Sequence, residues 1–262
     1  MRITTWNINS LRLRLDQVLR LLDVVAPDVL CLQEIKAEDH QVPVAALADA
    51  GYPHVALRGF KGYNGVATFS RQALTPAPHH DWCGRADGRH VAASLADGLE
   101  IHNFYVPAGG DVPDPAENDK FAHKLDFLAE MRTWFDTQRR ADKPMILVGD
   151  LNIAPLASDV WNHKQLLKVV SHTPVEVAAL DTLQSGLGWV DAVRRMIPPE
   201  QPLYSWWSYR ARDWSAADKG RRLDHVWVTG GLAERVRGAQ VHRDVRGWEK
   251  ASDHAPVTVD ID

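Results

Sequence analysis

Short apolar strands that end in acids and amides recur along this chain and restrict its possible folds. The segment MILVGDLNIAP, residues 145–155, runs four apolar residues into Gly149 and then sets Asp150 and Asn152 two positions apart. The segment SDHAP, residues 252–256, makes a similar polar corner near the other end of the chain. Short apolar runs bounded by turn residues are typical of buried strands. The pattern therefore predicts a buried strand over 144–149 with Asp150 and Asn152 at its tip.

Other helices and strands follow in an irregular order. An amphipathic helix with apolar residues at 15, 18, 19, 22 and 25 precedes a predicted buried strand over 29–33. A hairpin is predicted around Asp97-Gly98, a common two-residue turn. A long helix is predicted over about 117–140, and helical patterns continue through about 160–196. Additional strands are predicted over 65–71, 203–207, 222–228, 239–245 and 255–261.

The number of predicted strands indicates the fold class. It exceeds what a simple alternation of strand and helix would supply, and no low-complexity tract, tandem repeat or linker interrupts the 262 residues. This favours an α/β fold: a four-layer α/β sandwich in which two packed mixed β-sheets are flanked by helices. We expect residues 1–262 to form a single domain.

Composition and charge exclude several classes of protein. No segment is long and apolar enough to span a membrane, the N-terminus lacks the apolar run of a signal peptide, and two cysteines provide no disulfide framework, so we expect a cytoplasmic protein. The net charge of −4 argues against a protein that merely coats nucleic acid. Residues 204–250 nevertheless hold ten Lys or Arg against six Asp or Glu. Localised phosphate contact and ordinary solvated charge both explain this excess.

Polar side chains at the strand ends are the candidates for chemistry. A single polar residue at a strand end is usually a cap or turn residue. Here the ends of five predicted strands are rich in carboxylates and amides, which indicates that these ends lie together at one edge of the fold. The oxygen ligands Asn7, Glu34, Asp150 and Asp253 suit a hard cation such as Mg²⁺ or Mn²⁺, and no HxxxH or CxxC spacing favours zinc. A cation, a water-activating carboxylate and the nearby residues Asp224 and His254 suit phosphodiester hydrolysis.

Eight motifs in order give the chain a family resemblance. WNINSLR, PDVLCLQEIK, GVATFSR, NFYVPAG, GDLNIAP, YSWWSYR, RRLDHVWV and SDHAPV together resemble the exonuclease III family of abasic-site endonucleases. That family belongs to the endonuclease/exonuclease/phosphatase superfamily, with a DNase I-like fold, and the resemblance runs through essentially the whole chain. Each motif alone is weak, but eight in sequence are highly specific.

The resemblance implies a role for individual residues. It assigns the principal metal carboxylate to Glu34, with Asn7 and Asp253 nearby, and Mg²⁺ as the metal with Mn²⁺ as a substitute. In the catalytic set, Asp150 aligns or deprotonates the attacking water, and Asn152 orients the water and the phosphate. His254 contacts the scissile phosphate with Asp224 as its carboxylate partner, and Tyr105 touches the phosphate or the leaving oxygen.

The aromatic segment YSWWSYRARDW, residues 204–214, resembles the border of the family's pocket for the baseless sugar. Aromatic and arginine side chains interleaved in this way suit stacking on bases and contacts to phosphates. Because neighbouring strand residues face opposite ways, at least one tryptophan of the pair is expected in the core. The DNA-binding candidates here are Trp206, Trp207, Tyr209, Arg210 and Arg212, with Arg221, Arg222 and the loop residue Arg89 as further candidates.

The sequence departs from the family pattern at three positions. Val177 stands where an arginine is expected, Ser208 where aspartate is common, and His225 where an apolar or aromatic residue is usual. His225 follows Asp224 directly, so the strand alternation predicts that it faces away from the site. The divergent region 155–180 shapes the DNA groove in the family, which leaves the balance of activities open.

The predicted function is a Mg²⁺-dependent DNA repair nuclease. It would cleave phosphodiesters 5′ to abasic sites and process 3′ ends as a 3′→5′ exonuclease or 3′-phosphodiesterase, on double-stranded DNA, without a membrane and as a monomer. One alternative is a related phosphoesterase acting on lipid substrates. The other is a non-catalytic nucleic-acid-binding regulator on the same fold, as in the catabolite repression control proteins.

Overall fold

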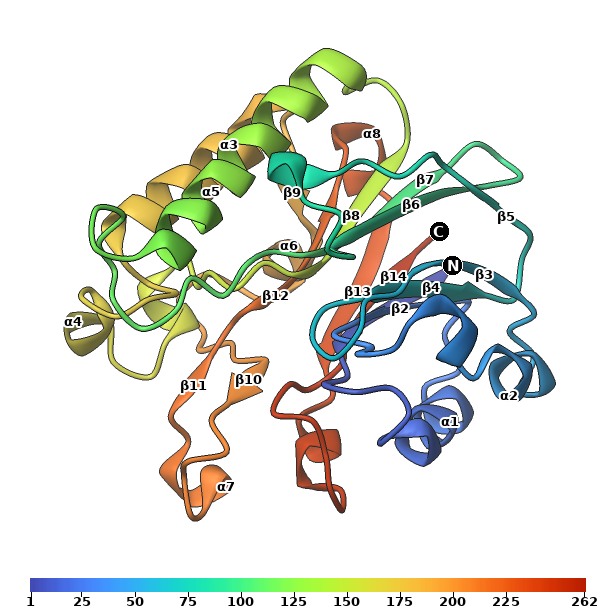
Figure 1. Ribbon diagram of the computed structural model, residues 1–262, viewed down its shortest axis with the longest axis horizontal. Helices are drawn as coiled ribbons and strands as arrows, with labels where there is room; N and C mark the ends of the chain where they lie inside the picture. The colour runs from blue at the N-terminus through green and yellow to red at the C-terminus, as the bar shows by residue number, and fades with distance from the viewer.

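Two six-stranded sheets form the centre of the computed structural model, which describes residues 1–262 (Figure 1). The first sheet has the strand order β13(Val236–Val241), β14(Val257–Ile261), β1(Arg2–Asn7), β2(Val29–Gln33), β4(Val66–Ser70), β3(His54–Arg58). The second has the order β5(Leu74–Pro76), β6(His90–Leu95), β7(Glu100–Tyr105), β8(Met145–Asp150), β12(Asp224–Val228), β9(Val190–Asp191). A separate short ribbon pairs β10(Trp206–Trp207) with β11(Gly220–Arg221).

Both sheets are mixed. The pairs β1–β2 and β7–β8 are parallel, and the remaining strand pairs are antiparallel. Gly98 takes a φ of +86° in the turn between β6 and β7, as the predicted hairpin requires. The long connections from β1 to β2 and from β7 to β8 contain helices, because parallel neighbours need a crossover.

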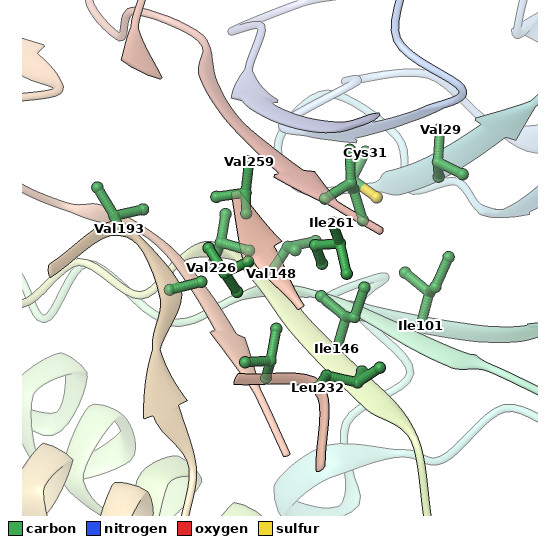
Figure 2. Close-up of a cluster of buried hydrophobic side chains, with 14 of the residues drawn as sticks. Val29, Cys31, Ile101, Ile146, Val148, Val193, Val226, Leu232, Val259 and Ile261 are labelled. Carbon is green, nitrogen blue, oxygen red and sulfur yellow. The ribbon is translucent and has the colours of Figure 1, made fainter. Parts of the chain in front are cut away.

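The central core lies between the two sheets. Figure 2 shows branched side chains from both sheets meeting there, with Val29 and Cys31 of β2 and Val259 of β14 approaching Ile146 and Val148 of β8. The alternate residues of β2, Leu30 and Leu32, lie in a different cluster with α1. Strand periodicity of two therefore explains why these strands are apolar throughout: each face is covered.

Helices cover the outer face of each sheet. The cluster outside the first sheet includes residues of α1(Leu15–Val24) and α2(Val44–Asp49), and the cluster outside the second includes residues of α3(Asp119–Gln138) and α5(Pro174–Gly186). Figure 1 shows these two groups of helices on opposite sides of the paired sheets. The prediction of a four-layer α/β sandwich is confirmed.

No helix is both long and apolar enough to cross a membrane.

The predicted helical stretch over 160–196 is several elements. It contains α4(His163–Leu166), α5, the short strand β9 and α6(Ala192–Met196), with α7(Trp214–Ala217) and α8(Gly230–Ala233) following later. Thr173 caps α5 and Pro174 occupies its first turn, so the helix starts there. Short 3₁₀ turns lie at Asp39–Gln41, Trp82–Gly84, Ala157–Asp159 and Arg243–Gly247. The strand predicted over 239–245 ends earlier, at Val241, because the last of these turns follows it.

One end of the sandwich gathers the tips of several inner strands. The parallel pairs place Asn7 beside Gln33 at the ends of β1 and β2, and Tyr105 beside Asp150 at the ends of β7 and β8. The antiparallel strand β12 begins at the same end, where Asp224 pairs with Asp150. The topology thus brings together polar residues that are far apart in the sequence.

Candidate active site

A cavity of about 630 Å³ opens at this end of the sandwich. Its lining includes the predicted residues Glu34, Tyr105, Asp150, Asn152, Asp253 and His254. The remaining two predicted residues of the catalytic and metal sets, Asn7 and Asp224, lie behind this lining and hydrogen-bond to it. The structure therefore brings all eight side chains together, while their individual roles stay predictions.

His254 and Asp224 form a buried pair. His254 Nδ1 donates to Asp224 Oδ2 at 2.8 Å, and its Nε2 lies 3.6 Å from Asp150 Oδ2. Burial alone would lower the pKa of His254, but the carboxylates of Asp224 and Asp150 raise it to about 10. Ser205 Oγ fixes the pair by donating to Asp224 Oδ2 at 2.6 Å. At neutral pH the ring is an imidazolium, a hydrogen-bond donor to an anion.

Asp150 is held in a desolvated position at the tip of β8. Burial raises its pKa to about 7, with the charges of Asp224 and Glu34 acting in the same direction and His254 opposing them. Its Oδ1 accepts from Asn152 N at 2.9 Å, and its Oδ2 accepts from Asn7 Nδ2 at 2.9 Å. A carboxylate with a pKa near neutrality can take a proton from water.

Asn152 follows in the left-handed region, with a φ of +55°. Its Nδ2 donates to Val106 O at 2.9 Å, which leaves Oδ1 as the free acceptor of the amide.

Tyr105 lies beside Asp150 at the end of the neighbouring strand β7. Burial, followed by the charges of Glu34 and Asp150, raises the pKa of Tyr105 well above its ordinary value. The Tyr105 hydroxyl therefore stays protonated and can donate a hydrogen bond.

Glu34 supplies a second carboxylate to the cavity. Its Oε1 and Asp150 Oδ2 both accept from Asn7 Nδ2, each at 2.9 Å, and Lys36 Nζ lies 2.9 Å from Oε2. Burial raises the pKa of Glu34, but the charge of Lys36 and the hydrogen bond from Asn7 lower it by more. The pKa of Glu34 therefore lies below its ordinary value. Two carboxylates that share one amide group repel each other, which a hard cation would relieve.

Asp253 is the third acid of the predicted metal set. Its Oδ1 accepts from Asn9 Nδ2 at 3.1 Å and its Oδ2 from Trp206 Nε1 at 2.9 Å, which orients the carboxylate in the cavity wall. Asp150, Asp224 and His254 also lie close enough to surround an ion. In that second arrangement the ring of His254 donates to Asp224 through Nδ1, so only its Nε2 and the carboxylate oxygens could face an ion. On the Glu34 side of the cavity, the carboxylates of Glu34 and Asp253 are the oxygen donors that suit a hard cation.

The DNA-binding candidates fall into different places. Trp206 and Arg210 line the cavity, and Tyr209 is 50% exposed nearby. Arg212 is exposed and lines a neighbouring hollow, not the catalytic cavity. The guanidinium of Arg89 stacks 5.0 Å from the centre of the ring of Tyr105 and its Nε donates to Asp87 at 2.6 Å, so it borders the site as half of an ion pair.

Burial corrects two of the expected DNA contacts. Trp207 is 2% exposed and its Nε1 donates to Asp218 at 2.9 Å, so it is the buried member of the tryptophan pair. Arg222 is 1% exposed and pairs with Asp191 at 2.5 Å. Neither side chain presents a surface to DNA. Arg221, by contrast, lines the cavity and lies over the ring of Trp206 at 5.3 Å.

His225 faces away from the site, as the strand alternation predicts. Its Nε2 contacts Ile153 O at 2.8 Å in the buried interior behind β12. Burial, followed by the charge of Arg222, lowers the pKa of His225 to about 3. This histidine is neutral and has no contact with the cavity.

Sequence reasoning missed several residues of the site. Asn9 and Lys36 organise the carboxylates: Lys36 Nζ donates to Asn9 Oδ1 at 2.6 Å. On the far wall, Lys219 Nζ lies 4.7 Å from the ring centre of Trp161, and both line the cavity. Asn9 and Lys36 stand inside the recognised motifs WNINSLR and PDVLCLQEIK, which could have identified them. Trp161 lies in the divergent region 155–180, where no motif pointed to it.

The two-sheet sandwich, with a buried His–Asp pair, a desolvated carboxylate and the further carboxylates Glu34 and Asp253 at one end, defines a phosphoesterase of the α/β-sandwich class. The chain belongs to the Endonuclease/Exonuclease/phosphatase family, which matches residues 4–254.

Individual relatives agree with this assignment. The chain is 32% identical to exodeoxyribonuclease III of Haemophilus influenzae, over 98% of both chains. Its fold is similar to that of an AP endonuclease from Archaeoglobus fulgidus, with a TM-score of 0.93 and 31% identity over 100% of this chain and 99% of that one. It is also similar to the 3′ phosphatase NExo from Neisseria bound to product DNA hairpin, with a TM-score of 0.89 and 33% identity, over 100% of this chain and 99% of that one.

Proposed function

We propose that this protein is a DNA repair nuclease that hydrolyses phosphodiesters 5′ to abasic sites and processes 3′ ends. The observation that carries the proposal is the convergence of Asp150, Asn152 and the His254–Asp224 pair on one cavity beside Glu34. Full-length relatives named for exodeoxyribonuclease, AP endonuclease and 3′ phosphatase activities support it. Residues 1–262 would act as one catalytic domain and as a monomer.

Mg²⁺ is the proposed cofactor, with Mn²⁺ as a substitute. Glu34 and Asp253 would hold it, together with Asn7 once the amide oxygen turns toward the ion, because at present the Nδ2 of Asn7 faces the carboxylates. When bound, the cation neutralises charge on the scissile phosphate and its leaving oxygen. Oxygen ligands of this kind match the preference of Mg²⁺.

The protein side chains supply the remaining chemistry. Asp150 would accept a proton from the attacking water, while the free Oδ1 of Asn152 orients that water. The His254 imidazolium would donate to a phosphate oxygen, and Asp224 keeps the ring charged and fixes Nε2 toward the cavity. The Tyr105 hydroxyl, protonated at all working pH values, would donate to the phosphate or to the leaving oxygen. Asp150, Asn152 and His254 are already held by the hydrogen bonds described above, so these three groups would need little reorganisation.

Duplex DNA would lie across the open end of the sandwich. Trp206, Arg210 and Arg221 line one wall of the cavity, and Trp161 and Lys219 line the same opening. Cationic side chains here would contact phosphates and make binding sensitive to salt. An aromatic side chain beside the catalytic groups can occupy the gap left by a missing base.

The test uses end-labelled duplexes, one with an internal abasic site and one with an undamaged recessed 3′ end. The wild-type protein, Asp150→Asn and the control Asp142→Asn are compared in Mg²⁺ and in EDTA. Asp142 precedes β8 at the end of the strand far from the cavity and is exposed, so the same substitution there is matched and remote. We expect Mg²⁺-dependent incision at the abasic site that Asp150→Asn abolishes and Asp142→Asn retains.

The other outcomes separate the alternatives. Digestion of the recessed end alone would keep the chemistry and assign the protein to 3′-end processing. Tight DNA binding by folded wild-type protein without cleavage would favour the non-catalytic regulator. Release of phosphate or headgroup from phosphoinositide or sphingomyelin vesicles, without DNA cleavage, would favour the lipid phosphoesterase.

A further inference from the structure

A fully buried ion pair joins the two helices that cover the second sheet. Lys124 of α3 and Glu176 of α5 are both 0% exposed, and Lys124 Nζ lies 2.5 Å from Glu176 Oε1. The two helices, which overlap in the view of Figure 1, pack against each other. The pair lies beside the cavity loops, because Lys124 contacts Ala108 and Asn152. Nothing in the catalytic chemistry described above uses this pair.

The ammonium group of Lys124 also binds two cavity loops. It donates to Asn152 O at 2.8 Å and to Ala108 O at 3.3 Å. Asn152 carries the free amide oxygen of the site, and Ala108 lines the cavity. Gly109 lets this loop approach, because its φ is +90° and a Cβ there would lie 3.0 Å from Lys124 Cδ. Lys124 therefore fixes the loops that follow β7 and β8.

Glu176 binds a third loop. Its two carboxylate oxygens accept from Ser171 N at 3.0 Å, and Oε2 also accepts from Thr173 Oγ1 at 2.6 Å. Ser171 lines the cavity, and its Oγ accepts from Arg221 Nη1 at 2.8 Å. The ion pair thus links three segments of the cavity wall through one charged centre.

Helix capping accounts for Glu176, which is the third helical residue of the α5 capping box, but it does not account for a buried lysine beside it. Removing two charges from water is costly, and apolar replacements of buried ion pairs are often neutral or stabilising. Asn152 has a φ of +55°, a left-handed conformation that asparagine adopts more readily than most residues but that neighbouring contacts must still select over the ordinary ones. The bond from Lys124 Nζ to Asn152 O is a direct means of enforcing it.

We propose that Lys124 and Glu176 are positioning residues that hold the amide of Asn152 and the adjoining cavity wall in their reactive geometry. This inference rests on the proposed nuclease function. It assigns the pair no contact with substrate: Lys124 acts through the Asn152 and Ala108 carbonyls, and Glu176 acts through Lys124 and the Ser171 loop. A displacement of about 1 Å in a positioned group can cost on the order of 10²-fold in rate.

The experiment separates positioning from stability by neutralising both charges at once. Lys124→Met leaves a buried carboxylate without its partner, whereas Lys124→Met/Glu176→Gln leaves no buried charge and keeps an acceptor for Ser171 and Thr173. The control is Arg139→Met/Glu100→Gln, which removes an ion pair of 2.7 Å at the opposite end of β7. Thermal unfolding, kcat and KM for abasic-site incision are measured for each, with crystal structures of the double variants.

We expect Lys124→Met to lose stability and the double variant to regain it while its kcat stays about 10²-fold low at little-changed KM. The crystal structure of the double variant would show Asn152 displaced from Val106 O. Lys124→Gln/Glu176→Gln, which can donate to one carbonyl, would recover part of kcat. The control pair would keep a normal kcat.

Recovery of both stability and kcat in the double variant, with Asn152 unmoved, would overturn the proposal. If the double variant does not fold, Lys124→Arg gives a second test, because a larger planar guanidinium replaces the compact ammonium that lies 2.8 Å from Asn152 O and keeps the charge beside Glu176. If wild-type protein cleaves no DNA, the nuclease function has failed. The position of Asn152 in the variant structures then decides the positioning claim separately.

Discussion

Replacing Asp224 by asparagine should change the charge state of His254. In the wild-type protein the pKa of His254 is raised from 6.5 to about 10 against the effect of burial. That shift corresponds to a preference for the imidazolium of roughly 5 kcal/mol. Asp224 is the nearer carboxylate, at 2.8 Å against 3.6 Å for Asp150, and it alone accepts a hydrogen bond from the ring.

The expected fall in pKa follows from these distances. An opposite charge in contact shifts a pKa by about 1–3 units, and the lost charge-assisted hydrogen bond adds to that. With Asp224→Asn, burial would then dominate, and we expect the pKa of His254 to fall by about 3 units, to near neutrality. At pH 8 most of the imidazolium would be lost, and the incision rate would fall by on the order of 10²-fold or more, the range for loss of one oxyanion donor.

The same shift predicts how stability depends on pH. Because the folded pKa of His254 is raised, its stabilising contribution is complete below pH 6.5 and is lost as the pH rises through about 10. Wild-type protein without metal should therefore lose unfolding free energy across this window, and Asp224→Asn should lose less. Protein labelled with ¹³C-histidine would be titrated by NMR in EDTA, with His254→Gln assigning the resonance. A wild-type pKa near 6.5, or a pKa unchanged in Asp224→Asn, would refute the reasoning.

Three further predictions concern the metal, the strand and DNA binding. Glu34→Gln removes a cation ligand, so half-maximal incision should require about tenfold or more Mg²⁺; this is checked by Mg²⁺ titration, and an unchanged requirement would place the ion elsewhere. Gly149→Ala should prevent folding or lower the urea midpoint severely, because a Cβ at this residue, with φ +140°, would lie 1.9 Å from Phe104 O; a midpoint like that of wild type would show that β7 and β8 can separate there. Arg210→Ala should weaken duplex binding and reduce the slope of log affinity against log salt by about 1. Fluorescence anisotropy at several salt concentrations measures this slope, and a lower affinity at an unchanged slope would assign Arg210 a contact other than a phosphate.

The strands and their polar tips were readable from the sequence because their signal is local. Apolar runs such as 29–33 and 145–148 report burial on both faces, and turn residues mark where each run ends. The alternation of neighbouring side chains also gave the correct direction for His225, and it required one member of the tryptophan pair to be buried. The order of the eight motifs identified the family. Each motif lies on a strand or at a strand end.

Local patterns could not decide which arginines line the cavity. Arg221 and Arg222 are adjacent in the sequence, yet Arg221 lines the cavity and Arg222 is buried against Asp191. The difference comes from the course of the chain between β11 and β12. Likewise, only packing showed that Trp207, and not Trp206, is the buried member of the pair.

The sequence by itself determined the four-layer fold class, the strand ends that carry the chemistry and the family. The fold class and the strand ends follow from periodicity and turn chemistry, which are short-range, and the family follows from the order of eight short motifs along the whole chain. The tertiary structure alone decided the protonation of His254 and Asp150, the sharing of Asn7 between two carboxylates, and the Lys124–Glu176 link to Asn152. These depend on burial and on distances of about 3 Å between residues that lie far apart in the sequence, 143 positions in the case of Asn7 and Asp150, which no local pattern encodes.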